Sequence, residues 1–234
     1  MQKKRIISSY DKLYQKDNFR LSWEGEISLK YKIPKYVSLF LNQFKNLENL
    51  EILELGAGDG SITELIMKQL KYKRYIATEI SEEGVKKLKN KNIDASMMDA
   101  MDLKFKDNSF DIVCSFDTMH HVDNPVKMAR EMLRVTRKYF FLIEANGICI
   151  LRKVYERLPK YKETGERSYT PKKYMNFFKS KQLKKISIKP FLYMVPFTPS
   201  PLIKLMIKLS ETLEQVPILR WQGSSVLIYG EKFL

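Results

Sequence analysis

The sequence predicts an α/β fold with a doubly wound, mostly parallel sheet, and three observations support this. Short apolar runs alternate with amphipathic segments from about residue 51 to residue 143. One run, Phe110–Phe116, is largely apolar, as expected for a strand buried on both faces. The first run leads into Gly56–Gly60, where glycines allow a tight turn from strand to helix. This alternation is typical of a parallel sheet with helices on both faces.

The individual elements follow from hydrophobic spacing and capping residues. Apolar residues at helical spacing predict helices over about 28–44 and 61–70. Ser81 is a candidate N-cap with acidic residues in the first turn behind it, and Asp123 is expected to cap a helix through Val135. We predict strands at 51–55, 75–78, 93–97, 110–116, 139–143, about 185–195 and 224–231, helices within 147–180, and an amphipathic helix over about 202–216.

The net charge of +15 is unevenly distributed along the chain. Residues 1–49 carry +5, residues 50–150 carry −1 and residues 151–234 carry +11. Two interpretations stay open. The excess is either a Lys-rich bias on solvated faces, or it serves an anionic partner such as a phosphorylated substrate, nucleic acid or a membrane surface.

Cysteine content and the apolar runs exclude several classes. Cys114 and Cys149 each lie in an apolar run, so we expect two core thiols in a reducing, cytoplasmic compartment. No Cys/His spacing resembles a zinc site, and no metal is expected. The basic start Met1–Ser8 lacks the apolar core of a signal peptide, and no run reaches the roughly 18 apolar residues of a transmembrane helix.

The strongest chemical signal is the segment Glu54–Gly60, between a strand and a helix. Its spacing is G-x-G-x-G, with Ser61 where a dinucleotide fingerprint would have its third glycine. An acidic residue two positions before the first glycine suits a ligand with an amino acid end and no pyrophosphate. Glu79 ends the next strand, where a carboxylate can accept hydrogen bonds from both ribose hydroxyls of an adenosine. The alternative for Glu79 is a capping or solvated side chain.

Two further loops follow strands of the same sheet. Asp99 and Ala100 follow the third strand, where a carboxylate and a backbone amide can contact an adenine edge. The only two histidines, His120 and His121, follow the fourth strand, so one of them is expected near the reaction centre. Packing or capping of the next helix is the alternative role for this pair.

Together these segments resemble the class I S-adenosylmethionine-dependent methyltransferase family, in its branch of mostly small-molecule enzymes. The resemblance spans residues 10–144. It rests on Ile52–Gly60 as the first motif, Glu79 as the ribose-binding acid, Asp99-Ala100 as the adenine-contacting pair, Asp107–Val113 and Phe116–Val122 around the fourth strand, Tyr10, Asp11 and Tyr14 as an N-terminal lid, and Glu144 with Asn146 as an acid-x-Asn turn.

The resemblance implies a Rossmann-like sheet of seven strands with the last strand antiparallel. It divides the chain into a helical lid (1–48), a cofactor-binding core (49–146), a basic and mostly helical cap with one sheet strand (147–220) and a final core strand (221–234). It implies that S-adenosyl-L-methionine is bound by Tyr14, Glu54, Gly56, Ala57, Gly58, Gly60, Glu79, Ile80, Asp99, Ala100, Ser115 and Phe116. Candidate catalytic bases, needed only for a protonated acceptor, are His120 and Glu144.

The function expected from this resemblance is methyl transfer to a small or lipid-like acceptor. Aromatic residues interleave with Lys and Arg in the cap, so the acceptor is expected to be anionic or amphiphilic, bound in an apolar pocket with a cationic rim. The helix over 202–216 either packs on its own domain, covers an apolar substrate or contacts a membrane surface. The aromatic residues in question are Tyr155, Tyr161, Tyr169, Tyr174, Phe177 and Phe178.

Two other functions compete with this one. The basic flanks favour an RNA or protein methyltransferase. Against it, the Asn/Asp-Pro-Pro-aromatic tetrapeptide of many amino-group methylating enzymes is replaced here by Phe116–Met119. The other competitor is a SAM-binding regulatory protein without catalysis.

Overall fold

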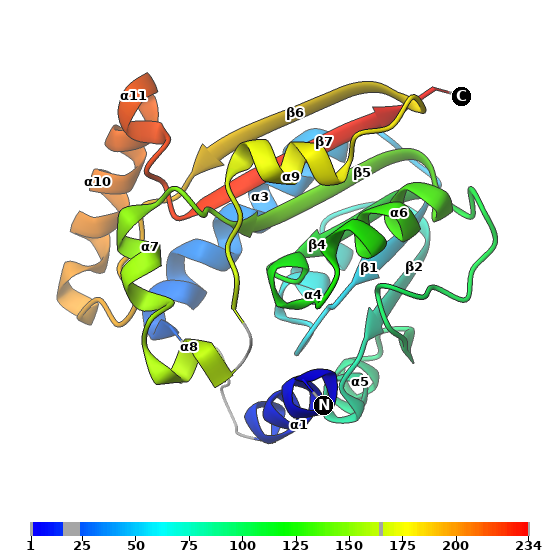
Figure 1. The fold of residues 1–234 in the computed structure, drawn as a ribbon, viewed down its shortest axis with the longest axis horizontal. Coiled ribbons are helices and arrows are strands. Elements are labelled where there is room, and N and C mark those ends of the chain that lie inside the picture. Colours follow the sequence, from blue (N-terminus) through cyan, green and yellow to red (C-terminus); the bar gives the residue numbers. More distant parts are fainter. Residues whose placement is uncertain (1, 16–23, 164–165, 234) are drawn as a thin grey trace.

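The computed structural model describes residues 2–15, 24–163 and 166–233, and in these ranges seven strands form one sheet (Figure 1). The strand order is β3-β2-β1-β4-β5-β7-β6. Strands β1 to β5 are parallel to one another, whereas β7 is antiparallel to both β5 and β6. The predicted fold class is confirmed. The strands are β1 (Leu50–Leu55), β2 (Tyr72–Glu79), β3 (Ala95–Met97), β4 (Phe110–Phe116), β5 (Thr136–Ala145), β6 (Leu183–Phe191) and β7 (Ser225–Lys232).

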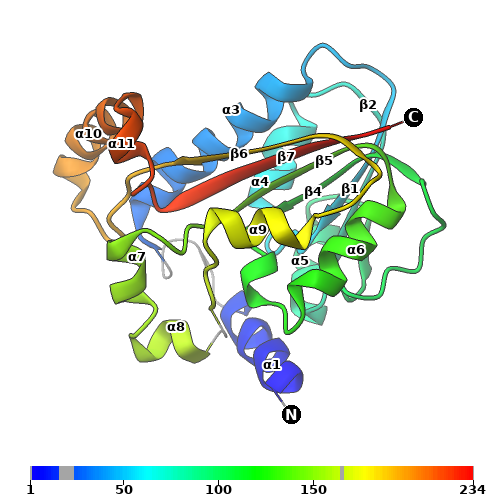
Figure 2. The ribbon, with the colours of Figure 1, turned by 45° about the horizontal axis from the view of Figure 1, so that its top comes forward.

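Helices cover both faces of this sheet (Figure 2). On one face, α3 (Ile33–Phe44) and α4 (Ser61–Met67) pack an aromatic layer in which Phe40 and Phe44 contact Phe141 of β5. On the other face lie α6 (Pro125–Val135) and α9 (Pro171–Phe177). Every residue of β4 is buried, as its apolar sequence predicts for the strand between β1 and β5.

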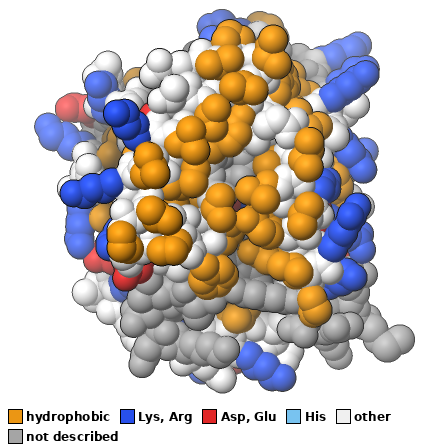
Figure 3. Space-filling model, turned by 90° about the vertical axis from the view of Figure 1, so that its left-hand side faces the viewer, with side chains coloured by type: hydrophobic (Ala, Val, Ile, Leu, Met, Phe, Trp, Pro, Cys, Tyr) orange, Lys and Arg blue, Asp and Glu red, His pale blue; other side chains and the backbone are white. Residues whose placement is uncertain are grey.

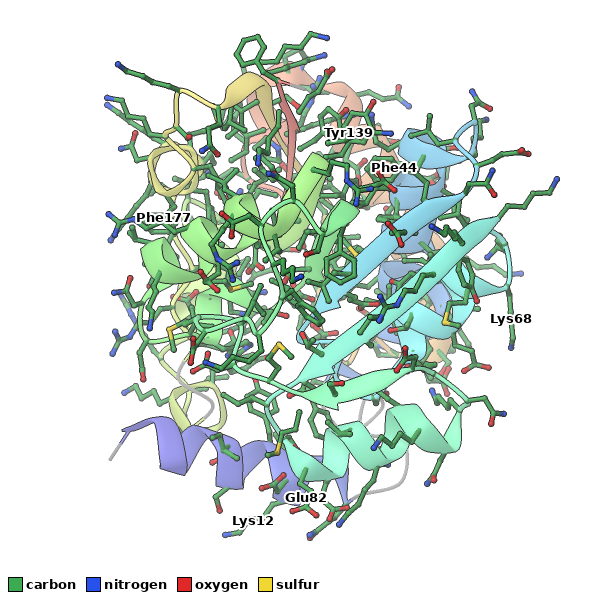
Figure 4. The ribbon with its side chains drawn as sticks, turned by 90° about the vertical axis from the view of Figure 1, so that its right-hand side faces the viewer. Lys12, Phe44, Lys68, Glu82, Tyr139 and Phe177 are labelled. Carbon is green, nitrogen blue, oxygen red and sulfur yellow. The ribbon has the colours of Figure 1, made fainter. Side chains whose placement is uncertain are left out.

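The N-terminal helix lies across the carboxyl ends of the parallel strands. Helix α1 (Gln2–Tyr14) runs beside α5 (Glu82–Asn90), and both lie below the sheet in Figure 4. The Ser81 hydroxyl, which caps α5 as predicted, also donates a 2.5 Å hydrogen bond to Asp11. The helix expected over 28–44 begins as a π-helical turn, Ser28–Lys32, and continues as α3.

The cap consists of short helices at one end of the sheet. They are α7 (Ile150–Tyr155), α8 (Pro159–Glu163), α10 (Ile203–Gln215) and α11 (Pro217–Arg220), with a 3-10 turn at Ser200–Leu202; another 3-10 turn, Met119–His121, follows β4 in the core. The division into lid, core and cap stays a prediction. Strand β6, which lies in the cap segment, pairs with β7 inside the common sheet. No helix among the described residues is long and apolar enough to span a membrane.

Several predicted boundaries were wrong, and three of them have a local explanation. Asn124, not Asp123, caps α6, since its side chain accepts the Lys127 amide. The third strand starts at Ala95 because Asn92 has a left-handed φ of 58°. The sixth strand ends at Phe191 because Leu192 turns the backbone with a φ of 67°.

Candidate functional site

The glycine-rich loop after β1 makes the tight turn that its glycines suggested. Gly56, Gly58 and Gly60 all have left-handed φ values, of 67°, 61° and 75°. A Cβ on Gly56 would lie 2.4 Å from Thr118 Cγ2, and one on Gly58 would lie 3.0 Å from the Tyr14 hydroxyl. The first two glycines therefore let Thr118 and Tyr14 pack directly against the loop backbone at the carboxyl end of the sheet.

The third glycine, Gly60, lies against helix α5 and not at the cavities. A Cβ on Gly60 would lie 2.9 Å from Leu88 Cδ2 of α5 and 3.0 Å from Ile93 Cδ1. Gly60 thus lets the loop pack against α5, which is a structural contribution to the site.

Glu79 ends β2 beside this loop and is buried. One carboxylate oxygen accepts the Gly58 amide at 2.9 Å, and the other accepts the Ile80 and Ser81 amides at 2.9 and 3.2 Å. Burial raises the pKa of this carboxyl, opposed by the three amides and assisted by the charge of Asp11. The loop and the acid predicted to meet at the cofactor do lie in contact.

A first cavity opens at Glu79, between the lid and the loops after β2, β3 and β4. Asp99, whose carboxylate accepts the Met101 amide at 2.8 Å, lies in its wall. Six predicted cofactor residues are brought together here: Tyr14, Gly56, Glu79, Ile80, Asp99 and Ala100. The remaining walls are Ile7, Tyr10, Met98, Met101, Asp117, Thr118, His121, Val122 and Asp123.

A second cavity adjoins the first and shares Tyr10, Tyr14, Gly56, Asp117 and His121 with it. It brings in three more predicted residues, which are Gly58, Phe116 and His120. Its other walls are charged side chains from the N-terminal and cap segments, namely Glu24, Lys32, Arg152 and Glu166.

These charges are paired with one another. Lys32 Nζ lies 2.5 Å from Glu24 and 2.9 Å from Asp117, and Arg152 lies 3.1 Å from Glu166. Asp117 follows β4 with a left-handed φ of 53°, which holds its carboxylate in the network. Burial would raise its pKa, but Lys32, His120 and Arg152 outweigh burial and hold the pKa well below its ordinary value.

The two candidate catalytic residues form a buried pair. His120 Nδ1 lies 2.7 Å from Glu144 Oε2, and the Glu144 carboxylate also accepts the amides of Thr118, Met119 and His120 at 2.8–3.2 Å. Burial lowers the pKa of His120, but the hydrogen bond and charge of Glu144 outweigh it and raise the pKa above its ordinary value. Glu144 lines none of the cavities described here, and its contacts position the 3-10 turn that carries both histidines.

Four of the predicted cofactor residues lie outside the two cavities. Glu54 is buried and accepts hydrogen bonds from Thr63 at 2.8 Å and Tyr75 at 2.6 Å. Ala57 donates its amide to Thr78, Gly60 packs on α5 and Ser115 is enclosed in β4. Their contact with a cofactor stays a prediction, and their geometry supports a role in shaping the loop.

A third cavity shares Glu24, Arg152 and Glu166 with the second. It has a mostly apolar wall of Cys149, Leu151, Tyr155, Tyr161, Met194 and Pro196, next to Ser224. Of the six cap aromatics only Tyr155 and Tyr161 line it. The others pack in the core, where Phe178 stacks on Phe140 and Tyr169, Tyr174 and Phe177 contact one another.

The expected cationic rim is not built from the cap lysines. No described lysine side chain between residues 151 and 189 lines any of the three cavities. The cations present are Lys32 and Arg152, and both are paired with carboxylates. The expectation of an anionic acceptor finds no support in this arrangement, because neither cation is left for a ligand charge.

Sequence reasoning missed the charged residues of the second cavity. Lys32 and Glu24 come from a segment interpreted only as an amphipathic helix, and Arg152 and Glu166 come from the segment after the fifth strand, where the family resemblance is weak. One signal was available, because Asp117 is an acid directly after a buried parallel strand.

Ligand atoms of His120, His121 and Glu166 lie within 4.8 Å of one another, as a metal site would require. Arg152 already pairs with Glu166, and Glu144 with His120. The cluster is therefore satisfied as a hydrogen-bonded charge network, and the prediction of a metal-free site is kept as a prediction.

Comparisons with known proteins bear on this geometry. Residues 53–142 match the model of the methyltransferase domain family Methyltransf_11. An uncharacterized methyltransferase of Schizosaccharomyces pombe is 29% identical over 143 residues, which cover 54% of this chain and 51% of the relative. The match thus spans about half the length of that relative.

Solved structures share the fold over most of the chain. A putative methyltransferase of Haloferax volcanii, in complex with the activator Trm112, has a TM-score of 0.70 at 14% identity, covering 95% of this chain and 97% of that one. Magnesium protoporphyrin IX methyltransferase from Synechocystis PCC 6803, with bound SAM, has a TM-score of 0.60 at 13% identity, covering 93% and 86%. Residues 53–142 match the methyltransferase domain family, and the chain around them has the class I methyltransferase fold.

Proposed function

We propose that this chain binds S-adenosyl-L-methionine across the carboxyl ends of β1, β2 and β4 and transfers its methyl group to a small or lipid-like acceptor. The observation that carries the proposal is the buried Glu79 carboxylate, held beside Gly58 at the edge of two connected cavities. Glu79 would hold the ribose, Asp99 and Ala100 the adenine, and Gly56, Gly58 and Phe116 the amino acid end. The backbone of Gly56 and Gly58 lines the second cavity, which fits a ligand in close contact with the loop.

The sulfonium of this cofactor supplies an already activated methyl group, so the chain has to align the acceptor and exclude water. The lid serves the second task, because Tyr10 and Tyr14 stack at 5.7 Å over the two cavities. The edge of Tyr10 meets His121, which lines both cavities.

A protonated acceptor requires a group that takes its proton. The raised pKa of His120 favours the charged imidazolium, which is a poor base. We therefore propose that His120 and Glu144 position the turn and that His121 faces the acceptor. Glu144 lines none of the three cavities, so it is proposed as a positioning residue and not as a base.

The acceptor we propose has a neutral polar reacting group and an apolar body. The paired charges of the second cavity suit a neutral group that can hydrogen-bond. The apolar wall of the third cavity, with Tyr155 and Met194, suits a hydrocarbon or ring body.

Methyl-labelled cofactor with fractionated extracts tests the proposal. We expect label in the lipid or small-molecule fraction, and no label with the Glu79→Ala variant. Label in RNA or protein would favour the competing substrate classes. Tight cofactor binding with no label in any fraction would instead identify a non-catalytic binding protein and contradict the proposal.

A further inference from the structure

Large apolar side chains are exposed together on the cap helices. The apolar face, as we define it, consists of Ile150, Val154, Leu205, Leu209, Ile218 and Trp221, with exposed fractions from 46% to 83%. Figure 3 shows hydrophobic side chains gathered across this side of the molecule, with Lys and Arg side chains at its edges. The face is continuous between helices, because the Ile150 amide donates to Gln222 beside Trp221. Contiguous exposure of this kind marks an interaction site, unlike single exposed residues.

Helix α10 has apolar residues on two sides, and only one of these sides packs against the rest of the molecule. Its packed side is held by Ile203 and by Ser210, whose hydroxyl accepts hydrogen bonds from Tyr31 and from the Tyr193 amide. A second apolar stripe, at spacings of three, four and seven residues, faces away from the molecule. Its members are Leu202, Leu205, Leu209 and Val216, between 41% and 64% exposed. The core therefore accounts for one side of α10 and leaves the other apolar side exposed.

The charges around the face are mainly positive. Lys204 and Lys208 are exposed on α10 together with one acid, Glu211, and Arg157 is exposed just after α7. The acid Glu214 is drawn inward, where it pairs with Lys35 at 3.0 Å. An apolar helix surface with basic neighbours and an exposed tryptophan is the arrangement that binds an anionic lipid interface.

The face also leads to the candidate reaction site. Helix α7 presents Ile150 and Val154 outward and Leu151 and Tyr155 to the third cavity. That cavity shares Arg152 with the second cavity, where methyl transfer is proposed. An amphiphile held at this surface would thus have an apolar path toward the proposed reaction site.

We propose that the apolar face docks this protein on an anionic lipid bilayer. Docking follows from the surface alone, whereas entry of the acceptor from the bilayer rests on the proposed function. Vesicle binding and cofactor binding are therefore measured separately, so that the failure of one is distinguishable from the failure of the other.

The experiment is co-sedimentation of the full chain with vesicles of phosphatidylcholine, with or without phosphatidylglycerol. We expect binding to the anionic vesicles. The double variant Leu205→Glu/Ile218→Glu should weaken it roughly tenfold or more. The double variant Lys204→Glu/Lys208→Glu should weaken binding roughly tenfold, and on anionic vesicles only, because each lysine near an anionic surface is attracted to it.

Two controls are matched to these variants. Phe233→Glu removes an apolar side chain that is 60% exposed at the far end of β7, and Lys172→Glu/Lys179→Glu makes the same charge change on and beside α9. Both should retain binding, and all variants should keep the thermal unfolding and cofactor affinity of the parent. Absence of vesicle binding by the folded parent, or equal loss in the controls, would overturn the proposal. So would a dimer that Leu205→Glu/Ile218→Glu dissociates, because the face would then belong to a second copy.

Discussion

Glu79 shows how much of the candidate site depends on a single side chain. Its carboxylate is buried, and three backbone amides donate hydrogen bonds to it and compensate for the lost water. Such a group is costly for the fold, since burial raises its pKa. In the proposed function, a ligand with two vicinal hydroxyls would add two donors to this carboxylate and offset part of that cost.

We expect Glu79→Ala to weaken S-adenosyl-L-methionine binding by about 2 kcal/mol or more, because each hydrogen bond to a charged group contributes about 1.5–3 kcal/mol. Titration calorimetry measures this change. Glu82→Ala is the matched control, since Glu82 lies three residues away and points outward from α5 (Figure 4). Unchanged affinity in a folded Glu79→Ala protein would remove Glu79 from the site.

The buried pair of His120 and Glu144 predicts a pH dependence of stability. The folded-state pKa of His120 is raised above the unfolded value of about 6.5, so protonation stabilises the fold. This contribution is fully present below about pH 6.5 and is lost as the pH rises through the folded-state pKa. The difference in unfolding free energy between the parent and His120→Gln should therefore shrink as the pH rises. Denaturant unfolding at several pH values measures it, and a difference that grows with pH would contradict the assigned direction.

The glycine-rich loop separates two functions within one element. Gly58 faces the Tyr14 hydroxyl at the second cavity, whereas Gly60 faces Leu88 and Ile93 in the packing of α5. A side chain at either position is strained by the left-handed backbone. Only at Gly58, however, would the new atom also enter the space assigned to the cofactor.

We expect Gly58→Ala and Gly60→Ala both to lose roughly 1–3 kcal/mol of stability from the left-handed backbone. Gly58→Ala should also weaken cofactor binding well beyond Gly60→Ala when both are compared as folded proteins. Thermal unfolding and titration calorimetry on the same samples separate the two effects. Equal affinities in the two variants would place the loop away from the cofactor.

The lid helix α1 is held to the core by a polar contact as well as by aromatic rings. Asp11 accepts a hydrogen bond from the Ser81 hydroxyl at the start of α5, which fixes α1 and its last residue, Tyr14, at the first cavity. Asp11→Ala should release α1 and weaken cofactor binding roughly fivefold, as expected for the loss of about 1 kcal/mol. Lys12→Ala is the control, because Lys12 points away from the core (Figure 4). Hydrogen exchange of residues 2–15 should accelerate in Asp11→Ala only, and unchanged exchange would argue against this anchor.

For the molecule as a whole, the sequence predicts the sheet and the residues around the first cavity better than the residues around the second cavity. Strand β4 is apolar and the loop at Gly56–Gly60 has a fixed spacing, so local patterns determine both. The second cavity is different, because it combines Lys32, Asp117 and the Arg152–Glu166 pair from three segments that are distant in the chain. Such pairs depend on tertiary packing and leave no periodic signal. The cap aromatics were likewise interpreted as a binding surface, although four of the six pack in the core.

This placement of aromatics and charges leads to a last prediction about nucleic acid. Proteins that bind single-stranded RNA stack its bases on exposed aromatic rings, which adds to the affinity that charge attraction alone provides. Of the six cap aromatics only Tyr155 and Tyr161 line the cavities at the proposed site, so the net charge of +15 is expected to dominate nucleic-acid binding there. Binding of a single-stranded oligonucleotide should then be no tighter than binding of a non-aromatic polyanion of equal charge, with a similarly steep salt dependence. Fluorescence anisotropy competition over a salt series measures both. An oligonucleotide that outcompetes the polyanion at high salt, and loses this advantage in Tyr155→Ala, would instead favour an RNA methyltransferase.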